Sequence, residues 1–321
     1  MLVDQYVLIA GTSRFQEKRS DWQVAQCLAR LGHSVFPVEY NNVPDLLAAI
    51  NDKQPDIVFN LTQLAHGDRR MDVHLCALFE LIGIPYTGAG PRGLMLGRDK
   101  AVSKFIAERA GFRVPSFFVV GPGSLDIPRD LGLPIVVKPR FGDASEGVSA
   151  ASLVFTRRQL VGRIRHLRRA GCDDVICEEY VDGRELFAGV VHDRMVHPKE
   201  FLFNRTSRRA PRLATTAFKY DKKYQKRWAI RAELADLSAS QFADLERLVH
   251  AASVALEVGD YGRFDVRLTP GGDWVFLEAN PNPGLGPPDK NWAGTWDSVD
   301  YDAMIQAILD SAIARARRRG R

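Results

Sequence analysis

The residues with the clearest chemistry in this chain are two carboxylates, Asp265 and Glu278, on either side of a Pro-Gly-Gly turn. Segments of alternating apolar and polar residues flank the turn and predict two antiparallel strands. With the turn centred between Gly271 and Gly272, Asp265 faces Glu278 at about 5 Å between Cβ atoms. Facing carboxylates repel each other, and a hard cation that takes oxygen ligands, such as Mg²⁺, removes that repulsion. We therefore favour a metal site here over an ordinary solvated hairpin.

Two further polar residues belong to this predicted site. Because side chains alternate with period two along a strand, Arg263 shares a face with Asp265, and Asn280 shares one with Glu278. The amide oxygen of Asn280 is another ligand of the kind that Mg²⁺ prefers. The apolar residues expected on the opposite face are Phe264, Val266, Val275 and Leu277.

The stretch 135–149 has the residue types of a phosphate site. An apolar strand that begins at Ile135 delivers Lys138 and stops at Pro139. The loop that follows holds two glycines and several small residues, so its backbone N–H groups can approach phosphate oxygens closely. It is not a Walker loop, because the lysine precedes the glycines. A glycine-rich hairpin without a ligand is the alternative.

Length and composition restrict the class of protein. The 321 residues suffice for two or three subdomains, and 45% hydrophobic with 26% charged residues is typical of a soluble globular protein. No apolar run approaches the ~20 residues of a membrane span, and the start of the chain lacks a signal-peptide pattern. Four cysteines without a CxxC pair indicate reduced thiols. We expect a cytoplasmic protein that contacts no membrane.

The net charge of +5 comes partly from the end of the chain, where residues 315–321 include five arginines. We expect this tail to be the frayed, solvated end of the last helix. Without it the chain is close to neutral, which argues against a nucleic-acid partner. Six arginines in a predicted helix at 155–170 are likewise expected on a solvated face.

The elements that position these residues follow from hydrophobic periodicity. In the first part of the chain, strands are predicted at 6–10, 34–38 and 56–60, and helices at 21–31, 46–51 and 73–82. Such alternation indicates a doubly wound parallel sheet. No GxGxxG motif follows the first strand, so we expect strand-end loops for a small substrate rather than a dinucleotide site.

The remainder of the chain mixes helices with further strands. Helices are predicted at 99–110, 155–170, 241–256 and 301–316, and strands at 135–139 and 175–185, the latter entering a turn. The helix at 99–110 carries Lys100 and Lys104 on one face. Residues 218–227, which include Lys219, are predicted to form a basic loop.

Seven segments, in family order, resemble D-alanine–D-alanine ligases of the ATP-grasp superfamily over nearly the whole chain. They are Gly83–Gly88, Asp99–Lys100, Val137–Ser149, Glu178–Glu185, Lys219–Tyr220, Gly262–Val266 and Leu277–Gly284. The resemblance implies an N-terminal α/β domain at 1–92, a central ATP-grasp subdomain at 93–178 and a C-terminal one at 179–321. The implied fold class is α/β, with α+β in the ATP-grasp part, where two antiparallel sheets clasp ATP.

The resemblance also assigns roles by position. The residues implied to bind phosphate are Lys100, Lys138, Ser145 and Lys219. Those implied to bind the base and ribose are Glu178, Glu179, Tyr180, Val181, Glu185 and Leu277. Asp265, Glu278 and Asn280 are the implied metal ligands, in agreement with the hairpin argument. The implied catalytic groups are Arg263, the backbone of Gly284 and Lys219, the first two stabilising the oxyanion of a tetrahedral intermediate.

The implied reaction uses ATP and Mg²⁺ or Mn²⁺ in two steps. A carboxylate takes the γ-phosphoryl group to give an acyl phosphate, while metal and lysines neutralise the developing charge. An amine then displaces the phosphate and forms an amide bond. The expected partners are a small carboxylate and an amine, both amino acids, and a homodimer is compatible with the sequence.

The amino-acid pocket departs from the family pattern. Ala144 stands where the family has the first of two adjacent serines, although Tyr220 matches its tyrosine. The segment around Glu17 does not align cleanly, His66 lies in an altered loop, and the family's serine-bearing segment becomes Leu285–Asp289. We therefore expect an ATP-dependent ligase with an altered substrate pocket.

Two alternatives remain open. The first is a genuine D-alanine–D-alanine ligase of cell-wall synthesis that uses substitute residues. The second is an ATP-binding regulatory protein without turnover, against which Arg263 speaks, because ATP binding alone does not require it.

Overall fold

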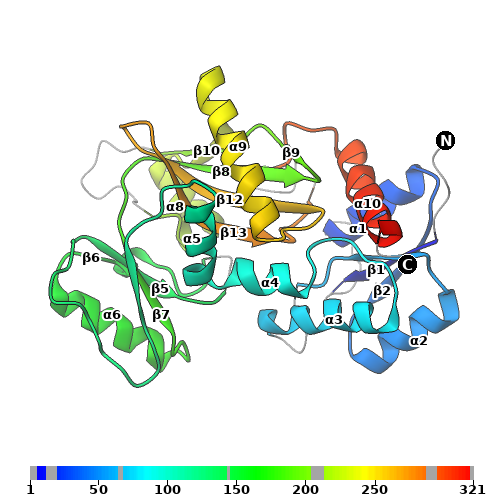
Figure 1. Cartoon of the computed structure of the whole chain (residues 1–321), viewed down its shortest axis with the longest axis horizontal. Coiled ribbons are helices and arrows are strands. Elements are labelled where there is room, and N and C mark those ends of the chain that lie inside the picture. Colours follow the sequence, from blue (N-terminus) through cyan, green and yellow to red (C-terminus); the bar gives the residue numbers. More distant parts are fainter. Residues whose placement is uncertain are drawn as a thin grey trace.

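The computed structural model describes residues 6–11, 20–63, 68–142, 145–203, 213–286 and 295–318. Three β-sheets organise these residues (Figure 1). The N-terminal sheet lies at one end of the long axis, the sheet of residues 117–179 lies at the other, and the C-terminal sheet lies between them (Figure 1). The two-part ATP-grasp arrangement expected after an α/β domain is therefore present.

The N-terminal sheet is parallel, with β1 (Tyr6–Gly11) between β2 (Ser34–Glu39) and β3 (Ile57–Asn60). Helices cover both of its faces, as the alternation of elements predicts. The helix α1 (Ser20–Arg30) packs on one face, and α2 (Val43–Lys53) and α3 (Asp72–Ile82) pack on the other. The doubly wound arrangement is confirmed.

The last helix, α10 (Tyr301–Arg318), returns to the N-terminal sheet and packs beside α1. Its Arg315 is not the start of a frayed tail, which corrects the sequence-based expectation. The Arg315 guanidinium donates to the carbonyls of Gly88 and Tyr86 and pairs with the buried carboxylate of Asp260 at 3.1 Å. Burial raises the pKa of Asp260, and Arg315 offsets part of that shift. The helix thus joins the N-terminal domain to the C-terminal sheet.

Two helices connect the N-terminal domain to the central sheet. The helix α4 (Pro91–Arg98) was not predicted, although a proline at its first position is a known start signal. The helix α5 (Lys100–Arg109) follows at once, because the Asp99 carboxylate caps it by accepting from the backbone N–H groups of Ala101 and Val102.

The central sheet has the order β4-β7-β5-β6 and is antiparallel. Its strands are β4 (Phe117–Val120), β5 (Ile135–Pro139), β6 (Leu153–Val154) and β7 (Val175–Glu179). The helix α6 (Arg157–Arg169) packs Leu160, Ile164 and Leu167 against this sheet.

The arginines of α6 do not all lie on a solvated face, as had been expected. Arg163 is buried and donates to the Gly147 carbonyl and to Ser152 Oγ, while Arg168 donates to the carbonyls of Gly121 and Ser124. Backbone carbonyls that lack a helix or strand partner need donors, and these arginines supply them.

The C-terminal sheet has the order β11-β10-β8-β12-β13, with β9 paired to β8. Its strands are β8 (Arg184–Val191), β9 (Arg194–Met195), β10 (Lys199–Leu202), β11 (Arg231–Leu234), β12 (Tyr261–Leu268) and β13 (Trp274–Pro281). The helix α9 (Ala239–Ala255) covers the face that carries Phe264, Val266 and Phe276.

The basic stretch predicted as a loop contains two short helices, α7 (Thr216–Tyr220) and α8 (Lys222–Trp228). Each begins at a capping residue. Thr215 Oγ1 accepts from the backbone N–H of Phe218, and the Asp221 carboxylate accepts from those of Lys223 and Tyr224. Thr215 and Asp221 are residue types that signal a helix start, and the sequence analysis did not use them.

The hairpin β12–β13 pairs Asp265 with Glu278, as predicted, but a β-bulge lies beside that pair. On the turn side of the bulge, Val266 pairs with Phe276, so Phe276 rather than Val275 shares the buried face. The predicted places of Val275 and Leu277 on the apolar face are therefore wrong. A bulge sets two residues of one strand against one residue of its partner strand. Leu277 is the extra residue here, and like Glu278 it lines the pocket described below.

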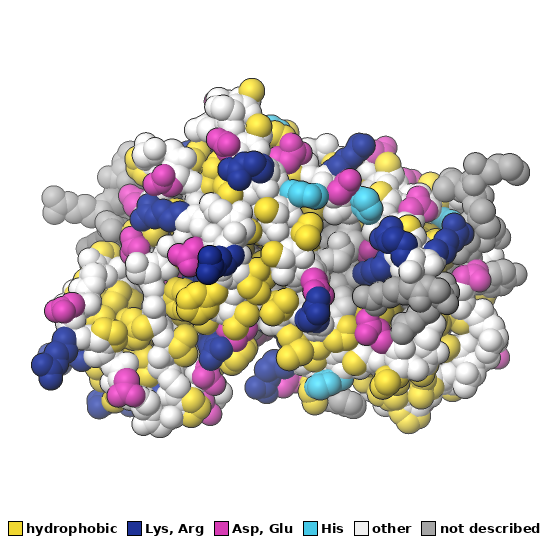
Figure 2. All heavy atoms as spheres, viewed as in Figure 1, with side chains coloured by type: hydrophobic (Ala, Val, Ile, Leu, Met, Phe, Trp, Pro, Cys, Tyr) yellow, Lys and Arg dark blue, Asp and Glu magenta, His cyan; other side chains and the backbone are white. Residues whose placement is uncertain are grey.

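No helix among the described residues is long and apolar enough to cross a membrane. On the face shown in Figure 2, basic and acidic side chains are interspersed and do not gather into a basic patch.

Candidate active site

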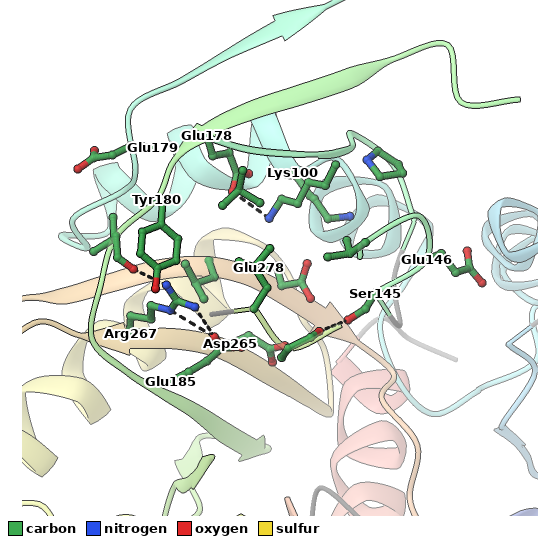
Figure 3. Close-up of a pocket in the computed structure, with 18 of the residues that line it drawn as sticks. Lys100, Ser145, Glu146, Glu178, Glu179, Tyr180, Glu185, Asp265, Arg267 and Glu278 are labelled. Atoms are coloured by element: carbon green, nitrogen blue, oxygen red, sulfur yellow. Dashed lines mark hydrogen bonds and ion pairs between the residues drawn. The ribbon is translucent and has the colours of Figure 1, made fainter. Parts of the chain in front are cut away.

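A pocket opens between the central and C-terminal sheets, at the place where β5, β7, β12 and β13 face one another (Figure 3). Twelve of the residues assigned from the sequence line it: Lys100, Lys138, Ser145, Glu178, Glu179, Tyr180, Val181, Glu185, Lys219, Asp265, Leu277 and Glu278. Segments more than a hundred residues apart in the chain thus meet in one cavity. Arg263, Asn280 and Gly284 do not line it.

Asp265 lies at the floor of the pocket within a polar cluster. Arg263 Nε donates to its Oδ1 at 2.7 Å and Arg263 Nη2 to its Oδ2 at 3.1 Å, while Asn280 Nδ2 lies 3.3 Å from Oδ1. Burial raises the pKa of Asp265; Arg263 opposes that shift and Glu278 adds to it. Arg263 and Asn280 therefore do not line the pocket themselves but contact Asp265, which does.

For Glu278, neighbouring cations outweigh the effect of burial on the pKa. Burial alone would raise its pKa, but Lys100, Lys138, Lys219 and Arg263 surround the carboxylate and lower it to about 2. Glu278 is thus held ionised, next to an Asp265 whose charge is disfavoured. The two facing carboxylates differ because the cations are distributed unequally around them.

These two carboxylates and the Asn280 amide fit a hard divalent cation by the chemistry of their donors. No group of three or more His, Cys, Asp or Glu side chains suited to a metal occurs in the described part of the chain. The assignment therefore rests on a pair of carboxylates with an amide, as the hairpin argument anticipated.

Lys138 and Glu178 form part of a buried ionic chain that includes Lys104, which sequence reasoning did not assign to the site. Glu178 pairs with Lys104 Nζ through Oε1 and with Lys138 Nζ through Oε2, both at 2.9 Å. Lys104 also donates to the Leu277 carbonyl at 2.6 Å. Burial lowers the pKa of Lys104 to about 8, although Glu178 opposes that shift. The spacing of Lys104 one helical turn after Lys100 was the available signal.

Arg267 is a second pocket residue that the sequence analysis missed. It stands two positions after Asp265 on β12, so strand alternation places it on the same face. Its guanidinium pairs with Glu185 Oε2 at 2.6 Å and donates to the Val181 carbonyl. The Tyr180 ring lies 5.1 Å from the guanidinium carbon.

The glycine-rich loop is anchored from several sides. Lys100 Nζ donates to the Gly142 carbonyl, and Ser145 Oγ donates to the Ala214 carbonyl at 2.9 Å. From the N-terminal domain, Arg69 Nε donates to Glu146 at 3.1 Å. All three parts of the chain therefore contribute to holding this loop over the pocket.

Gly284 is exposed and lies beyond the hairpin, where the buried Trp296 and the partly buried Tyr301 contact the chain. Trp296 Nε1 donates to the Gly284 carbonyl at 3.0 Å, and Tyr301 Oη donates to the Leu285 carbonyl at 2.8 Å. The remaining substrate candidates, Glu17, His66, Ala144 and the segment 287–289, lie outside the described residues, as does the side chain of Tyr220.

Comparison with known proteins places this geometry in context. Residues 123–309 match the family described as the D-ala D-ala ligase C-terminus. The chain is 27% identical to a D-alanine–D-alanine ligase of Gluconobacter oxydans, over 96% of this chain and 99% of that one. It is 32% identical to the uncharacterized protein y4sG of Sinorhizobium fredii, over 85% of this chain and 78% of that one.

The fold has a counterpart among solved structures. The D-alanine–D-alanine ligase of Bacillus anthracis, solved in complex with ATP, superposes with a TM-score of 0.76 at 20% identity and covers 98% of both chains.

Proposed function

Because the chain belongs to the D-alanine–D-alanine ligase family of ATP-grasp enzymes, and is thus an ATP-dependent ligase, we propose that it joins a small carboxylate to an amine through an acyl phosphate. The observation that carries the proposal is the set of three lysines, Lys100, Lys138 and Lys219, that line the pocket between the two sheets together with Glu278. A site of this kind suits a polyphosphate, because cations offset the charge of phosphate oxygens.

The chain's own residues have separable tasks in this proposal. Lys100, Lys138 and Lys219 bind the phosphates and neutralise the charge that develops during phosphoryl transfer. Asp265, Glu278 and Asn280 would hold Mg²⁺ or Mn²⁺, which supplies further charge neutralisation when bound. The Tyr180–Val181 segment and Leu277 line the part of the pocket assigned to the base.

Arg263 and Gly284 act at the second step, in which the amine attacks the carbonyl carbon. Arg263 is held between Asp265 and the ring of Phe187, 5.5 Å from the guanidinium carbon, so its direction is set before substrate arrives. A donor fixed in advance stabilises the developing oxyanion without reorganisation. The backbone N–H of Gly284 is the second donor in this proposal.

The substrate pair is proposed to differ from two D-alanines. Three features of the sequence support a different substrate pair: Ala144, the displaced Glu17 segment and the proline-rich stretch after Gly284. A polar pocket rejects ligands that leave its hydrogen-bonding groups unpaired, so changes in those groups alter the preferred ligand. The alternative, a genuine D-alanine–D-alanine ligase, is favoured by the Gluconobacter oxydans relative, which matches over 99% of its length.

A single assay separates these possibilities. Purified protein is incubated with ATP, Mg²⁺ and a grid of carboxylates and amines, and release of ADP is coupled to a colour reaction. Substrate-dependent ADP release supports a ligase, and its absence across the grid while ATP still binds would favour the regulatory alternative. Efficient formation of D-alanyl-D-alanine from D-alanine alone would refute the altered pocket while leaving the ligase assignment intact.

A further inference from the structure

The pocket has two ends of different electrostatic character. At one end, the lysines 100, 138 and 219 gather around Glu278. At the other end, Arg267 pairs with Glu185, so that these two charges offset each other. Phosphates belong at the cationic end, and the uncharged part of a nucleotide therefore belongs at the paired end.

The Arg267 guanidinium fixes three groups at the paired end (Figure 3). Nε and Nη2 both donate to Glu185 Oε2, at 3.2 and 2.6 Å, and Nη1 donates to the Val181 carbonyl. Tyr180 lies beside the guanidinium, with its ring centroid 5.1 Å from the guanidinium carbon. The Arg267 side chain is 7% exposed and that of Glu185 13%, so both are fixed by packing as well as by charge.

This geometry leaves one oxygen of Glu185 available to a ligand. Both guanidinium donors use Oε2, and the hydrogen bonds of the described residues include none to Oε1. Glu185 also lines the pocket, so a bound ligand can reach this carboxylate. A carboxylate oxygen aligned in this way suits a hydroxyl donor, and the hydroxyls of a nucleotide are on its ribose.

We propose that Arg267 is a positioning residue for the nucleotide sugar, and that it makes affinity depend on a ribose hydroxyl by orienting Glu185 Oε1 and the Tyr180–Val181 segment. The inference rests on the proposed function in that it takes ATP as the ligand of the pocket. Without Arg267, Glu185 loses the two hydrogen bonds that fix its rotamer and the Val181 carbonyl loses the Arg267 donor, so the hydroxyl contact is lost.

The test measures binding and needs no turnover. Wild type, Arg267→Met and Arg184→Met are titrated by calorimetry with ATP, 2′-deoxy-ATP and 3′-deoxy-ATP. The control is closely matched, because Arg184 pairs with Glu200 of the same sheet at 2.7 Å and also donates to a backbone carbonyl, that of Asp236. Arg184 precedes Glu185 on β8 and therefore faces away from the pocket.

We expect wild type and Arg184→Met to bind one or both deoxy analogues on the order of tenfold more weakly than ATP, as a lost charge-assisted hydrogen bond predicts. Arg267→Met should bind ATP more weakly than wild type does, and its affinities for ATP and the deoxy analogues should differ by less than about threefold, because it lacks the contact with Glu185. Glu185→Gln should reduce this difference in affinity similarly. The double variant Arg267→Met with Glu185→Gln should show little further reduction.

Arg267→Lys guards against a simple folding defect. It keeps the buried charge, but an ammonium lacks the planar fork that grips Glu185 and the Val181 carbonyl together, so discrimination should still fall. Unchanged discrimination in folded Arg267→Met or Arg267→Lys, with ATP still bound, would overturn the inference and leave the proposed function standing. Absence of ATP binding by wild type would overturn the proposed function itself.

Discussion

Replacing Glu278 by glutamine tests the electrostatic balance of the site directly. If the facing Asp265 dominated, the Gln variant would relieve repulsion and be more stable than wild type without metal. The structure predicts the reverse, because Lys100, Lys138, Lys219 and Arg263 outweigh both burial and Asp265 and lower the pKa of Glu278 to about 2. The ionised carboxylate therefore stabilises the fold without metal.

The magnitude follows from the shift. A pKa lowered from 4.5 to about 2 corresponds to roughly 3 kcal/mol of stability at neutral pH. Because Glu278 is only half-buried, solvent screens part of this, and we expect Glu278→Gln to lose about 1–3 kcal/mol. A lowered carboxyl pKa contributes stability above the unfolded value of 4.5 that disappears as pH falls toward 2, so the difference from wild type should narrow below pH 4.5.

Asp265→Asn is the matched control. Burial raises the pKa of Asp265, so removing its charge at neutral pH should cost less stability than removing the charge of Glu278. Both variants should lose Mg²⁺-dependent turnover. The assay is urea denaturation at pH 7 in EDTA without nucleotide, repeated from pH 7 to 3.5. A Glu278→Gln protein as stable as wild type at pH 7 would refute this account of the cations.

Three further predictions concern contacts around the site. Lys138→Met should weaken ATP binding on the order of tenfold and also lower stability, because Glu178 loses one of its two cations; titration and urea denaturation measure the two effects, and unchanged affinity would reject the phosphate role. Trp296→Phe should lower kcat on the order of tenfold with little change in the KM for ATP, because Gly284 loses the donor that fixes its carbonyl; steady-state kinetics checks this, and a change confined to the KM for ATP would contradict it. Arg315→Ala should lower the midpoint of thermal unfolding, because Asp260 is left buried without its cation. Removal of the last three residues should leave that midpoint unchanged. Equal midpoints for the Ala variant and wild type would contradict a stabilising role of the Arg315–Asp260 ion pair.

Much of the site could be predicted from the sequence because it depends on local geometry. The facing of Asp265 and Glu278 follows from a turn and a period of two, and β12–β13 confirms it. The alternation of strands and helices likewise predicted the parallel N-terminal sheet. These features depend on neighbours within a few residues, which the sequence displays directly.

Other features depended on residues brought together by folding. Arg267 and Glu185 are 82 residues apart and meet only because β8 pairs with β12. Leu277 turns toward the pocket at a bulge, where Lys104 of α5 donates to its carbonyl. No local pattern contains the partner of such a residue.

The chain alone therefore determined which residue types carry the chemistry and which strands present them, because backbone periodicity is a local property. Only the tertiary structure decided the charge state of each carboxylate, the partners of Lys138 and the structural role of Arg315. Those depend on how many opposite charges lie within a few ångströms and how much water is excluded, and both quantities are set by segments distant in the sequence.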